Sequence, residues 1–258
     1  MLRVLCLLCL GFALPLYASE RLTIAAASDL RYALDEILSL YRQQQPQTEV
    51  RVIYGSSGKM TTQIRHGAPY DVFFSADIRF PQQLYQEGLA VLAPQLYAQG
   101  RIVLWSPRQN MSGISLTELP HLALHRLAIA QPSHAPYGQR AQEALIAAGV
   151  WQTLQAKLVY GENIAQTAQL AQSGGAEVAI IALSLAKFPE LARHGYQLIP
   201  AELHQPLTQA YTITRKGEAK ASAWHFVAFM QSAAVLAILQ QYGFEQPGLS
   251  TAVEPGDA

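Results

Sequence analysis

The sequence contains few charged residues and almost no cysteine. Only 14% of the 258 residues are Asp, Glu, Lys or Arg, against about 25% in an ordinary soluble protein. The 18 basic and 18 acidic side chains balance, so the chain lacks the basic excess that proteins use to hold nucleic-acid phosphates. Half of the residues are hydrophobic, which argues against disorder and allows one large or two medium domains with a buried core.

The chain begins with the pattern of a secretory signal peptide. Arg3 supplies a short positive region, residues 4–16 form an almost unbroken apolar run, and Ala18 offers a small residue for cleavage. The apolar run is shorter than the roughly 20 residues that span a bilayer comfortably, which disfavours an N-terminal anchor. We therefore expect residues 1–18 to be a signal peptide, cleaved before Ser19 or one residue later, and the mature protein to be periplasmic.

Both cysteines, Cys6 and Cys9, lie inside this N-terminal segment. The exported protein would therefore contain no disulfide and no thiolate chemistry. Neither cysteine follows the small-residue pattern of a lipoprotein cleavage site, so we expect no lipid anchor. No later segment is apolar for long enough to cross a membrane.

Strand-like and helix-like patterns alternate along the rest of the chain. Such alternation predicts an α/β fold with largely parallel sheets. Apolar residues at three- and four-residue spacing after Leu30 indicate the first helix. The expected strands are 21–27, 49–54, 71–75, 102–105, 127–130, 178–181 and 210–214, and the expected helices are about 30–41, 58–66, 138–148, 164–172 and 218–240.

The length exceeds that of a typical single domain, yet no repeat, low-complexity tract or long linker divides the chain. Two lobes joined by chain crossovers satisfy both facts. Residues 101–107 and 205–214 are candidate crossovers, which places one lobe at 20–103 plus 210–258 and the other at 104–209. In open α/β sheets, ligands bind beyond the carboxyl ends of strands, next to helix N-termini.

Two strand-to-helix turns in the first part of the chain carry small and polar residues. Ser28 ends a strand and opens a helix, so its hydroxyl and the free N–H groups of the first turn point the same way. A helix N-cap, worth about 1 kcal/mol, is the simpler interpretation. Gly55 and Gly58 flank Ser56 and Ser57 and allow the backbone to approach a ligand closely. This turn fits neither a phosphate-binding P-loop nor a nucleophile elbow, and it is also compatible with a plain tight turn.

Two further helix starts lie in the middle of the sequence. Pro136 and Gly138 fix a turn directly before a helix and leave the N–H of Tyr137 available as a donor. Asn163 is positioned to cap the helix that begins at Ile164. Each feature is weak alone, but four such helix starts in one exported two-lobed protein predict a shared ligand site.

The residue types at these turns favour an anion. Helix N-termini and hydroxyl groups attract negative charge, because the unpaired N–H groups are partly positive. Neutral donors without an acceptor favour an oxyanion that is fully deprotonated, whereas a phosphate receptor would offer a carboxylate for the remaining proton. Asp29 is the only such carboxylate near the turns, and we expect it to help start the helix instead. Lys59 is the only cation there, which disfavours a carboxylate receptor with an arginine clamp.

At these residues the sequence resembles the periplasmic molybdate-binding proteins of ABC transporters, through essentially the whole mature chain. The run from Gly67 to Asp77 is particularly specific, whereas a lone Ala-Ala-Ala-Ser would mean little. The motifs that carry the resemblance are Ala25-Ala-Ala-Ser28, Gly55-Ser-Ser57, Gly67-Ala-Pro-Tyr-Asp71-Val-Phe-Phe-Ser75-Ala-Asp77, Pro136-Tyr-Gly138 and Glu162-Asn-Ile164.

The resemblance implies a type II periplasmic binding protein fold: two lobes, each a mixed, mostly parallel sheet flanked by helices, with the ligand in the cleft between them. It further implies that Ser28 and Ser57 donate hydroxyl and main-chain N–H groups to a tetrahedral dianion. Tyr137 and Ile164 would donate main-chain N–H groups from the other lobe. Molybdenum would be bound as its oxyanion by these residues, not as a bare cation.

One departure concerns a tyrosine hydroxyl that many family members supply. The matching run, residues 180–183, has Ala182 where that tyrosine is expected. We consider the hydroxyl of Tyr137 as a replacement donor. The implied protein is not an enzyme, needs no cofactor, acts as a monomer and delivers molybdate or tungstate to the permease and ATPase subunits of a transporter.

Several alternatives remain open at the level of sequence. A receptor for sulfate, phosphate or a small organic anion would share the fold. A hydrolase built on Ser57 lacks a recognisable base, and His121 and His125 lie four apart without a clear shared helical face for a metal. Asp71 and Asp77 flank a strand and are expected to cap or buttress loops. We expect the apolar helix at 221–239 to pack in the core of the first lobe.

Overall fold

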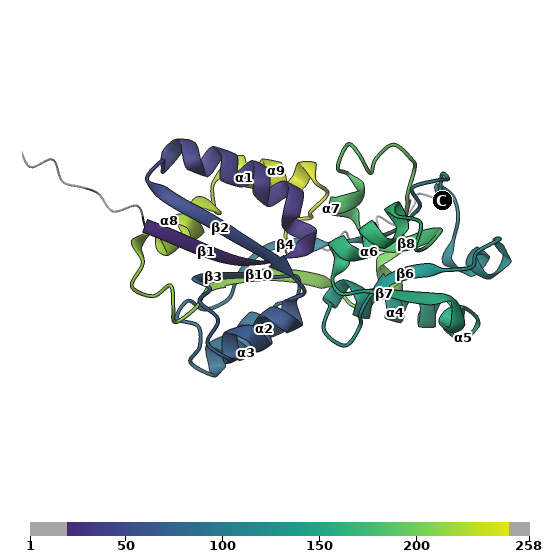
Figure 1. Ribbon diagram of the computed structural model, residues 1–258, viewed down its shortest axis with the longest axis horizontal. Helices are drawn as coiled ribbons and strands as arrows, with labels where there is room; N and C mark the ends of the chain where they lie inside the picture. The colour runs from purple at the N-terminus through teal and green to yellow at the C-terminus, as the bar shows by residue number, and fades with distance from the viewer. Residues whose placement is uncertain (1–19, 248–258) are drawn as a thin grey trace, which may run out of the picture.

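The computed structural model of the protein describes residues 20–247. Two α/β lobes lie end to end, each built around its own sheet (Figure 1). The predicted signal peptide, residues 1–18, lies outside the described residues. The two-lobed α/β fold class expected from the sequence is confirmed.

The first lobe is assembled from the two ends of the described chain. Its elements are β1 (Glu20–Ala27), α1 (Arg31–Gln44), β2 (Thr48–Gly55), α2 (Ser57–Arg65), β3 (Val72–Ser75), α3 (Arg79–Gln86), β4 (Gln95–Gly100), β10 (Leu207–Ile213), α8 (Ala221–Phe229) and α9 (Ala233–Gln241). The strand order is β2-β1-β3-β10-β4. β1 runs parallel to β2 and β3, whereas β10 runs antiparallel to β3 and β4.

The second lobe is formed by the middle of the chain. Its elements are β5 (Ile102–Trp105), β6 (Leu127–Ala130), α4 (Pro136–Ala147), α5 (Trp151–Leu154), β7 (Leu158–Gly161), α6 (Ile164–Gln172), β8 (Val178–Ala182), α7 (Leu183–Ala186) and β9 (Gln197–Leu198). The strand order is β7-β6-β8-β5-β9, in which β6 is parallel to β7 and β8, and β5 is antiparallel to β8 and β9.

The central strand β3 and the second half of β1 are mostly apolar and are buried because helices cover both faces of the sheet. Successive side chains of a strand point to opposite faces. Ile24 accordingly packs in the cluster that contains α1, α8 and α9, and its neighbour Ala25 packs in the cluster that contains α2 and α3. Figure 1 shows these two helical layers above and below the sheet.

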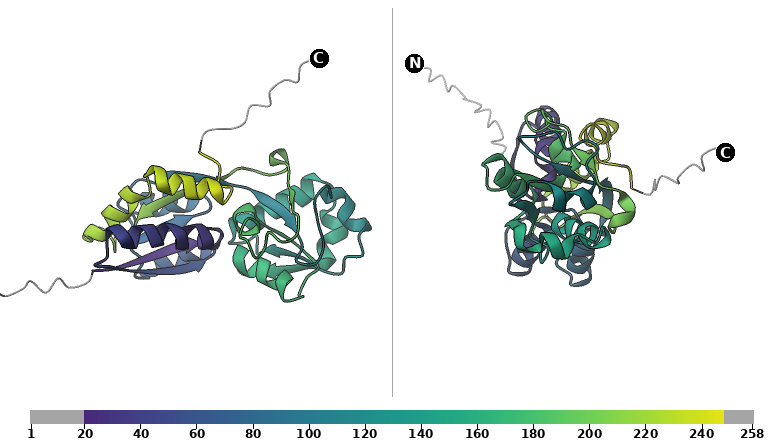
Figure 2. Two further views of the ribbon diagram at one scale, coloured as in Figure 1. Left: turned by 90° about the horizontal axis from the view of Figure 1, so that it is seen from above. Right: turned by 90° about the vertical axis from the view of Figure 1, so that its right-hand side faces the viewer.

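The lobes are joined by two extended crossovers, visible from above in Figure 2. In the first, the single residue Arg101 separates the end of β4 from the start of β5. Here Gly100 is required by close approach, because a Cβ atom would lie 2.3 Å from the hydroxyl oxygen of Tyr137. In the second, β10 returns to the first sheet from Leu207 onward. Residues 102–103 thus pair in the second sheet and residues 207–209 in the first.

The expectation of a single long helix at 218–240 is wrong. The chain forms α8 and α9 instead, bent by 64° at the break between them. The first helix ends at Phe229, and Ser232 starts the second, because its side chain accepts a hydrogen bond from the N–H of Val235 as an N-cap. Within residues 20–247 no single helix is long and apolar enough to span a membrane, and the bent pair meets that test by length and composition only.

Other expected elements are confirmed, and several were missed. The apolar stripe that begins at Leu30 is buried, although the segment starts as a 3-10 turn, Ser28–Leu30, before α1. The helix expected at 164–172 is found with these limits as α6. Sequence patterns did not indicate α3, β4 or β7, which are short or carry polar residues at several positions.

Candidate functional site

A pocket lies between the lobes at the helix starts singled out in the sequence. About 190 Å³ of space unfilled by atoms, part of it open to solvent, lies within it. All four residues expected at the ligand site, Ser28, Ser57, Tyr137 and Ile164, line it. The other lining residues are mostly small or apolar, and no Arg, Lys or His is among them: Ala27, Asp29, Gly55, Ser56, Ala76, Ala135 and Pro136.

Ser28 reaches across the cleft instead of capping its own helix. No side-chain cap is present on the 3-10 turn that Ser28 begins. Its Oγ accepts a hydrogen bond from the N–H of Ala165 at 3.2 Å and donates to Oδ1 of Asn163 at 3.0 Å, both in the first turn of α6 or at its cap. Asn163 also accepts from the N–H of Gln166, which confirms it as the N-cap of α6. The Ser28 hydroxyl therefore couples the first lobe to a helix start of the second.

Ser57 is the first residue of α2 and is fully buried. Its Oγ accepts a hydrogen bond from the N–H of Ala76 at 3.0 Å, which fixes the hydroxyl at the pocket wall. Among residues 20–247 the hydroxyl proton has no acceptor, so it is available to a ligand. The next residue, Gly58, donates its N–H to the carbonyl oxygen of His134 at 2.9 Å and so brings the start of α2 against the second lobe.

The second lobe contributes backbone donors. Tyr137 is the second residue of α4 and Ile164 the first residue of α6, so neither N–H has an acceptor within its own helix. Neither N–H has another partner among the described residues. Gly138 lets α4 start this close to β6, because a Cβ there would lie 2.0 Å from the carbonyl oxygen of Ala130. The two amides therefore face the pocket region as unpaired donors.

The Tyr137 hydroxyl, considered as a further donor to the ligand, is engaged within the protein in this structure. That hydroxyl donates to Oδ2 of Asp29 at 2.9 Å and accepts from Nε2 of Gln209 at 3.0 Å. Tyr97 in turn donates to Oε1 of Gln209. Tyr137 is 2% exposed, and its hydroxyl is packed against the crossover at Gly100. Sequence spacing could not reveal this chain of contacts, because its members come from four separate elements.

Asp29 lies in the pocket wall and, as expected, in the first turn of the helical segment that Ser28 begins. Burial raises the pKa of its carboxyl group to about 6. Nε2 of Gln209 donates to its Oδ2 at 2.8 Å. The amides of Asp29 and Leu30 lower the pKa somewhat, yet neither meets hydrogen-bond geometry with Oδ1, which is buried without a partner.

Ala182, which stands where the family tyrosine was expected, ends β8 and does not line the pocket. Two residues later, Ser184 in α7 donates its hydroxyl to the carbonyl oxygen of Asp29 at 2.8 Å. The end of β8 therefore supports the turn that holds Ser28 and Asp29 but adds no side-chain donor to the pocket.

Charged groups gather at the edge of the cleft instead of inside the pocket. His134 places Nδ1 2.9 Å from Oγ of Ser56 and Nε2 3.0 Å from Oε1 of Glu162. Glu162 also pairs with Lys59 of the first lobe. Desolvation lowers the pKa of His134, and the contact with Lys59 lowers the pKa of Glu162. We call Ser56, Lys59, His134 and Glu162 the rim cluster.

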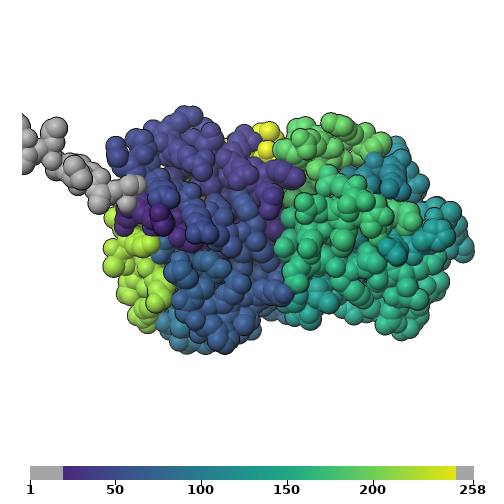
Figure 3. Space-filling view, in the orientation of Figure 1, coloured from purple at the N-terminus to yellow at the C-terminus, as the bar shows by residue number. Residues whose placement is uncertain are grey.

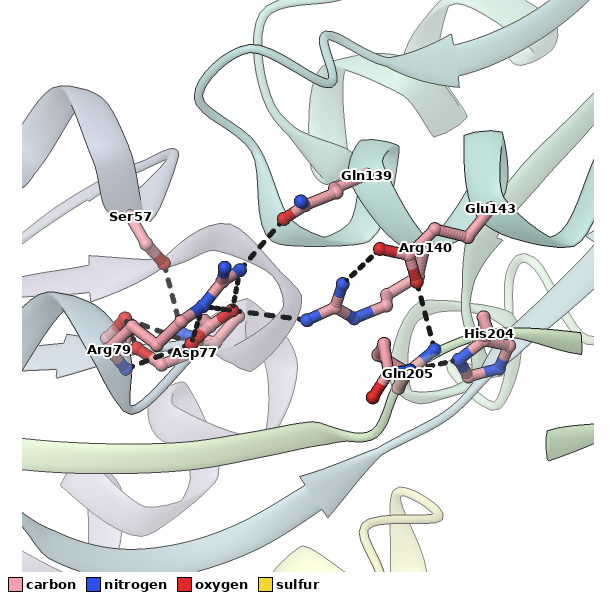
Figure 4. Close-up of polar contacts among 10 residues, drawn as sticks. Ser57, Asp77, Arg79, Gln139, Arg140, Glu143, His204 and Gln205 are labelled. Atoms are coloured by element: carbon pink, nitrogen blue, oxygen red, sulfur yellow. Dashed lines mark hydrogen bonds and ion pairs between the residues drawn. The ribbon is translucent and has the colours of Figure 1, made fainter. Parts of the chain in front are cut away.

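A second interlobe contact is buried and centres on Asp77 (Figure 4). Oδ2 of Asp77 lies 2.6 Å from Nη2 of Arg79 and 3.3 Å from Nη2 of Arg140 in α4. Arg140 also pairs with Glu143 at 2.6 Å, and Glu143 accepts from the N–H of Gln205 at 2.9 Å. Figure 3 shows the two lobes in contact on the face turned to the viewer. The lobes are therefore closed on one another.

The structure also tests the other sequence interpretations. Asp71 accepts from the N–H of Thr23 at 2.7 Å and pairs with Lys220, so its expected structural role is confirmed, as is that of Asp77. His121 ends a 3-10 turn and His125 lies beyond it. Among the described residues no group of three or more His, Cys, Asp or Glu side chains is arranged to hold a metal ion.

Comparison with known proteins places this geometry in a family. Residues 22–245 match the model of the family described as "Bacterial extracellular solute-binding protein". The chain belongs to this family. It is a solute-binding component, not an enzyme.

Relatives of this solute-binding protein carry a common description. The molybdate-binding protein ModA of Rhodobacter capsulatus is 35% identical over 244 residues, which are 92% of this chain and 92% of the relative. ModA of Azotobacter vinelandii is 31% identical over 225 residues, 86% of this chain and 88% of the relative. The resemblance recognised in the sequence motifs is thereby confirmed.

Solved structures support the same fold. The structure described as the periplasmic molybdate-binding protein of Azotobacter vinelandii superposes with a TM-score of 0.81 at 28% identity, covering 88% of this chain and 99% of that one. The sulfate-binding protein SubI of Mycobacterium tuberculosis has a TM-score of 0.73 at 12% identity, so this likeness concerns the fold alone.

Proposed function

We propose that this solute-binding protein captures molybdate or tungstate in the pocket between its lobes and delivers the anion to the permease and ATPase subunits of an ABC transporter. Ser28 and Ser57 donate their hydroxyl and main-chain N–H groups, the Ser28 hydroxyl turning from Oδ1 of Asn163 to the anion. Tyr137 and Ile164 donate main-chain N–H groups. No cofactor takes part, because the anion itself is the cargo.

The observation that carries the proposal is the convergence of four helix starts, two from each lobe, on one pocket without a cation. Helix first turns offer N–H groups with partial positive charge, which suit an anion that accepts on every oxygen. Molybdate-binding descriptions of the relatives at 35% and 31% identity support the same ligand. Since sulfate accepts the same hydrogen bonds, the size of the pocket would discriminate the larger anions.

Closure of the lobes follows from where the donors lie. An anion held by Ser57 on one side and Ile164 on the other stabilises the closed arrangement over an open one, because only the closed form presents all donors together. We propose lobe limits at Arg101 and Pro206, where the strands change sheet, in place of the limits expected from the sequence. The closed monomer in the periplasm, freed of residues 1–18, is the form that the permease would recognise.

A receptor for a protonated oxyanion such as phosphate is the second candidate. The observation that favours it is Asp29, a buried carboxyl group in the pocket wall that is able to accept a proton from the ligand. Sulfate and molybdate carry no such proton near neutral pH, so phosphate binding separates the two candidates.

Calorimetry on the ligand-stripped mature protein tests the proposal. We expect molybdate and tungstate to bind tightly, and sulfate and phosphate to give much weaker heats or none. Tight binding of sulfate or phosphate with none of molybdate would contradict the proposed ligand while leaving the fold intact.

The double variant Ser28→Ala, Ser57→Ala tests the site itself. Each lost hydrogen bond to a charged group costs about 1.5–3 kcal/mol, so we expect molybdate affinity to fall by roughly 10²- to 10⁴-fold. Ser173→Ala is the matched control, because this exposed hydroxyl contacts only the carbonyl of Leu170 far from the pocket. Unchanged affinity in the double variant would remove these residues from the site.

A further inference from the structure

The carboxyl group of Asp29 is divided between two environments. Oδ2 accepts hydrogen bonds from the hydroxyl of Tyr137 and from Nε2 of Gln209, at 2.9 and 2.8 Å. Oδ1 is buried and has no hydrogen-bond partner. The residue lines the same pocket as Ser28 and Ser57 and is only 1% exposed. Oδ1 is therefore the carboxyl oxygen left for a ligand.

Among the described residues no ion pair involves the carboxyl group of Asp29, so no cation compensates its charge. The titratable groups that face it are two hydroxyls, Tyr137 from α4 and Tyr97 from the β4 side, and burial raises the pKa of both well above the usual range. Gln209 from β10 and Ser184 from α7 are uncharged, and α6 contains no ionisable residue. The nearby guanidinium of Arg31 lies over the ring of Tyr54 instead.

An ionised Asp29 carboxylate would repel a bound dianion. Its charge is also buried without a cation to compensate it. A protonated carboxyl group removes the repulsion and becomes a donor. Since Oδ2 already accepts from two groups, the proton belongs on Oδ1. Resting on the proposed function, we infer that Asp29 binds the anion in its protonated form, donates from Oδ1 to an anion oxygen, and thereby couples the capture of each dianion to the uptake of one proton from solvent.

The inference has a definite pH dependence. Burial places the pKa of Asp29 at about 6 in the protein without the anion, and the dianion raises it further in the complex. Below about pH 6 the carboxyl group already carries its proton, so affinity does not depend on its titration. Above that pH each binding event must draw a proton from solvent, so molybdate affinity falls by up to tenfold per pH unit until the pKa of the complex is reached.

Calorimetric titration with molybdate in two buffers of different ionisation enthalpy counts the protons. At about pH 7 the free carboxyl group is roughly 90% ionised, so we expect close to one proton taken up per anion. At about pH 5 the expected uptake falls to a small fraction. This measurement uses the unmodified protein and needs no variant.

Asp29→Asn sharpens the test, because an amide keeps an acceptor for Tyr137 and Gln209 and presents a permanent donor in place of Oδ1–H. We expect this variant to bind molybdate without proton uptake and with the same affinity at about pH 6 and pH 8. Asp35→Asn is the matched control, since this carboxyl group is exposed on α1 and contacts Tyr54 away from the pocket, and it should keep the wild-type pH slope.

Each outcome decides a separate point. Tight molybdate binding without proton uptake in the unmodified protein would overturn the inference and leave the proposed function standing. Tight phosphate binding that Asp29→Asn abolishes would mean that the carboxylate accepts a proton from the ligand, which overturns the inference and favours the second candidate. Absence of binding to all four oxyanions at every pH would overturn the proposed function and the inference with it.

Discussion

The pocket and the edge of the cleft hold the lobes together by opposite means. In the pocket, the contacts between lobes are hydrogen bonds that involve no cation: the Ser28 hydroxyl meets Asn163 and Ala165 at the start of α6, and the Tyr137 hydroxyl donates to Asp29. At the edge, the contacts are ionic: Lys59 meets Glu162, and Asp77 meets Arg140. The two regions lie on the same interface between the same pair of lobes.

The difference reflects what each region has to do. A cation fixed in the pocket would attract any anion, and a carboxylate would repel it, whereas neutral donors leave selection to shape and to the number of accepting oxygens. Charges at the edge act on closure, because they meet only when the lobes approach. Capture is therefore assigned to neutral groups and closure to ion pairs, a division that substitutions on either side can break.

Among single substitutions, the largest effect is expected from Gly138→Ala, which disturbs the pocket side. The added Cβ would lie 2.0 Å from the carbonyl oxygen of Ala130, so the start of α4 must move away from β6 and take the Tyr137 amide with it. We expect a loss of about 3 kcal/mol in molybdate binding, the upper end of the usual cost of overpacking. Calorimetry measures it.

Gly113→Ala is the control for this substitution. Gly113 has a positive φ of 81° and nothing within 4 Å of its Cβ position, so the change strains the backbone without reaching the pocket. Gly113→Ala should lower the melting temperature and leave the affinity for molybdate unchanged. Wild-type affinity in Gly138→Ala would show that the α4 start does not position a ligand donor.

A smaller effect is expected from Arg140→Met at the buried ion pair. In the closed protein the variant leaves Asp77 without its partner from the second lobe, although Arg79 remains in contact. Removing one partner of a buried pair usually costs about 3–5 kcal/mol, and we expect about 2 kcal/mol here because Arg79 compensates in part, or roughly thirtyfold in affinity.

Lys220→Met is the matched variant inside one lobe. Lys220 pairs with the buried Asp71 at 2.8 Å, far from the cleft, so its loss should lower stability by about 1–2 kcal/mol without changing molybdate affinity. Equal affinity losses in the two variants would contradict the assignment of the Asp77 contact to closure.

The smallest effect is expected from Glu162→Gln in the rim cluster. Glu162 and Lys59 are about half exposed, at 47% and 50% of their side-chain surface. Exposed pairs contribute about 0.5 kcal/mol, so we expect roughly a twofold loss of affinity that disappears at high salt. A tenfold loss by titration at low salt would mean that the edge, and not the pocket, determines binding.

Much of the candidate site could be predicted from sequence because its donors lie at strand-to-helix turns, which short stretches of sequence indicate. Ser28, Ser57, Tyr137 and Ile164 each follow a strand pattern and open a helix pattern, and both patterns are readable over a few residues. The α/β alternation that joins them gave the fold class for the same reason.

The rest depends on contacts between distant segments. Gln209 donates to Asp29 from 180 residues away along the chain, and Tyr97, on a strand with polar residues, donates to Gln209. The partnership of Asp77 with Arg140 crosses the cleft and leaves no local signal. The break between α8 and α9 was missed because apolar residues continue on both sides of Ser232, whose capping hydrogen bond outweighs the pattern.

Anomalous scattering from a crystal of the protein with molybdate tests the central claim most directly. We expect one molybdenum peak between the lobes, with anion oxygens about 2.7–3.2 Å from the hydroxyls of Ser28 and Ser57 and from the N–H groups of Tyr137 and Ile164. A peak beside Arg79 and Arg140, with none in the neutral pocket, would contradict the claim that helix starts without cations hold the anion.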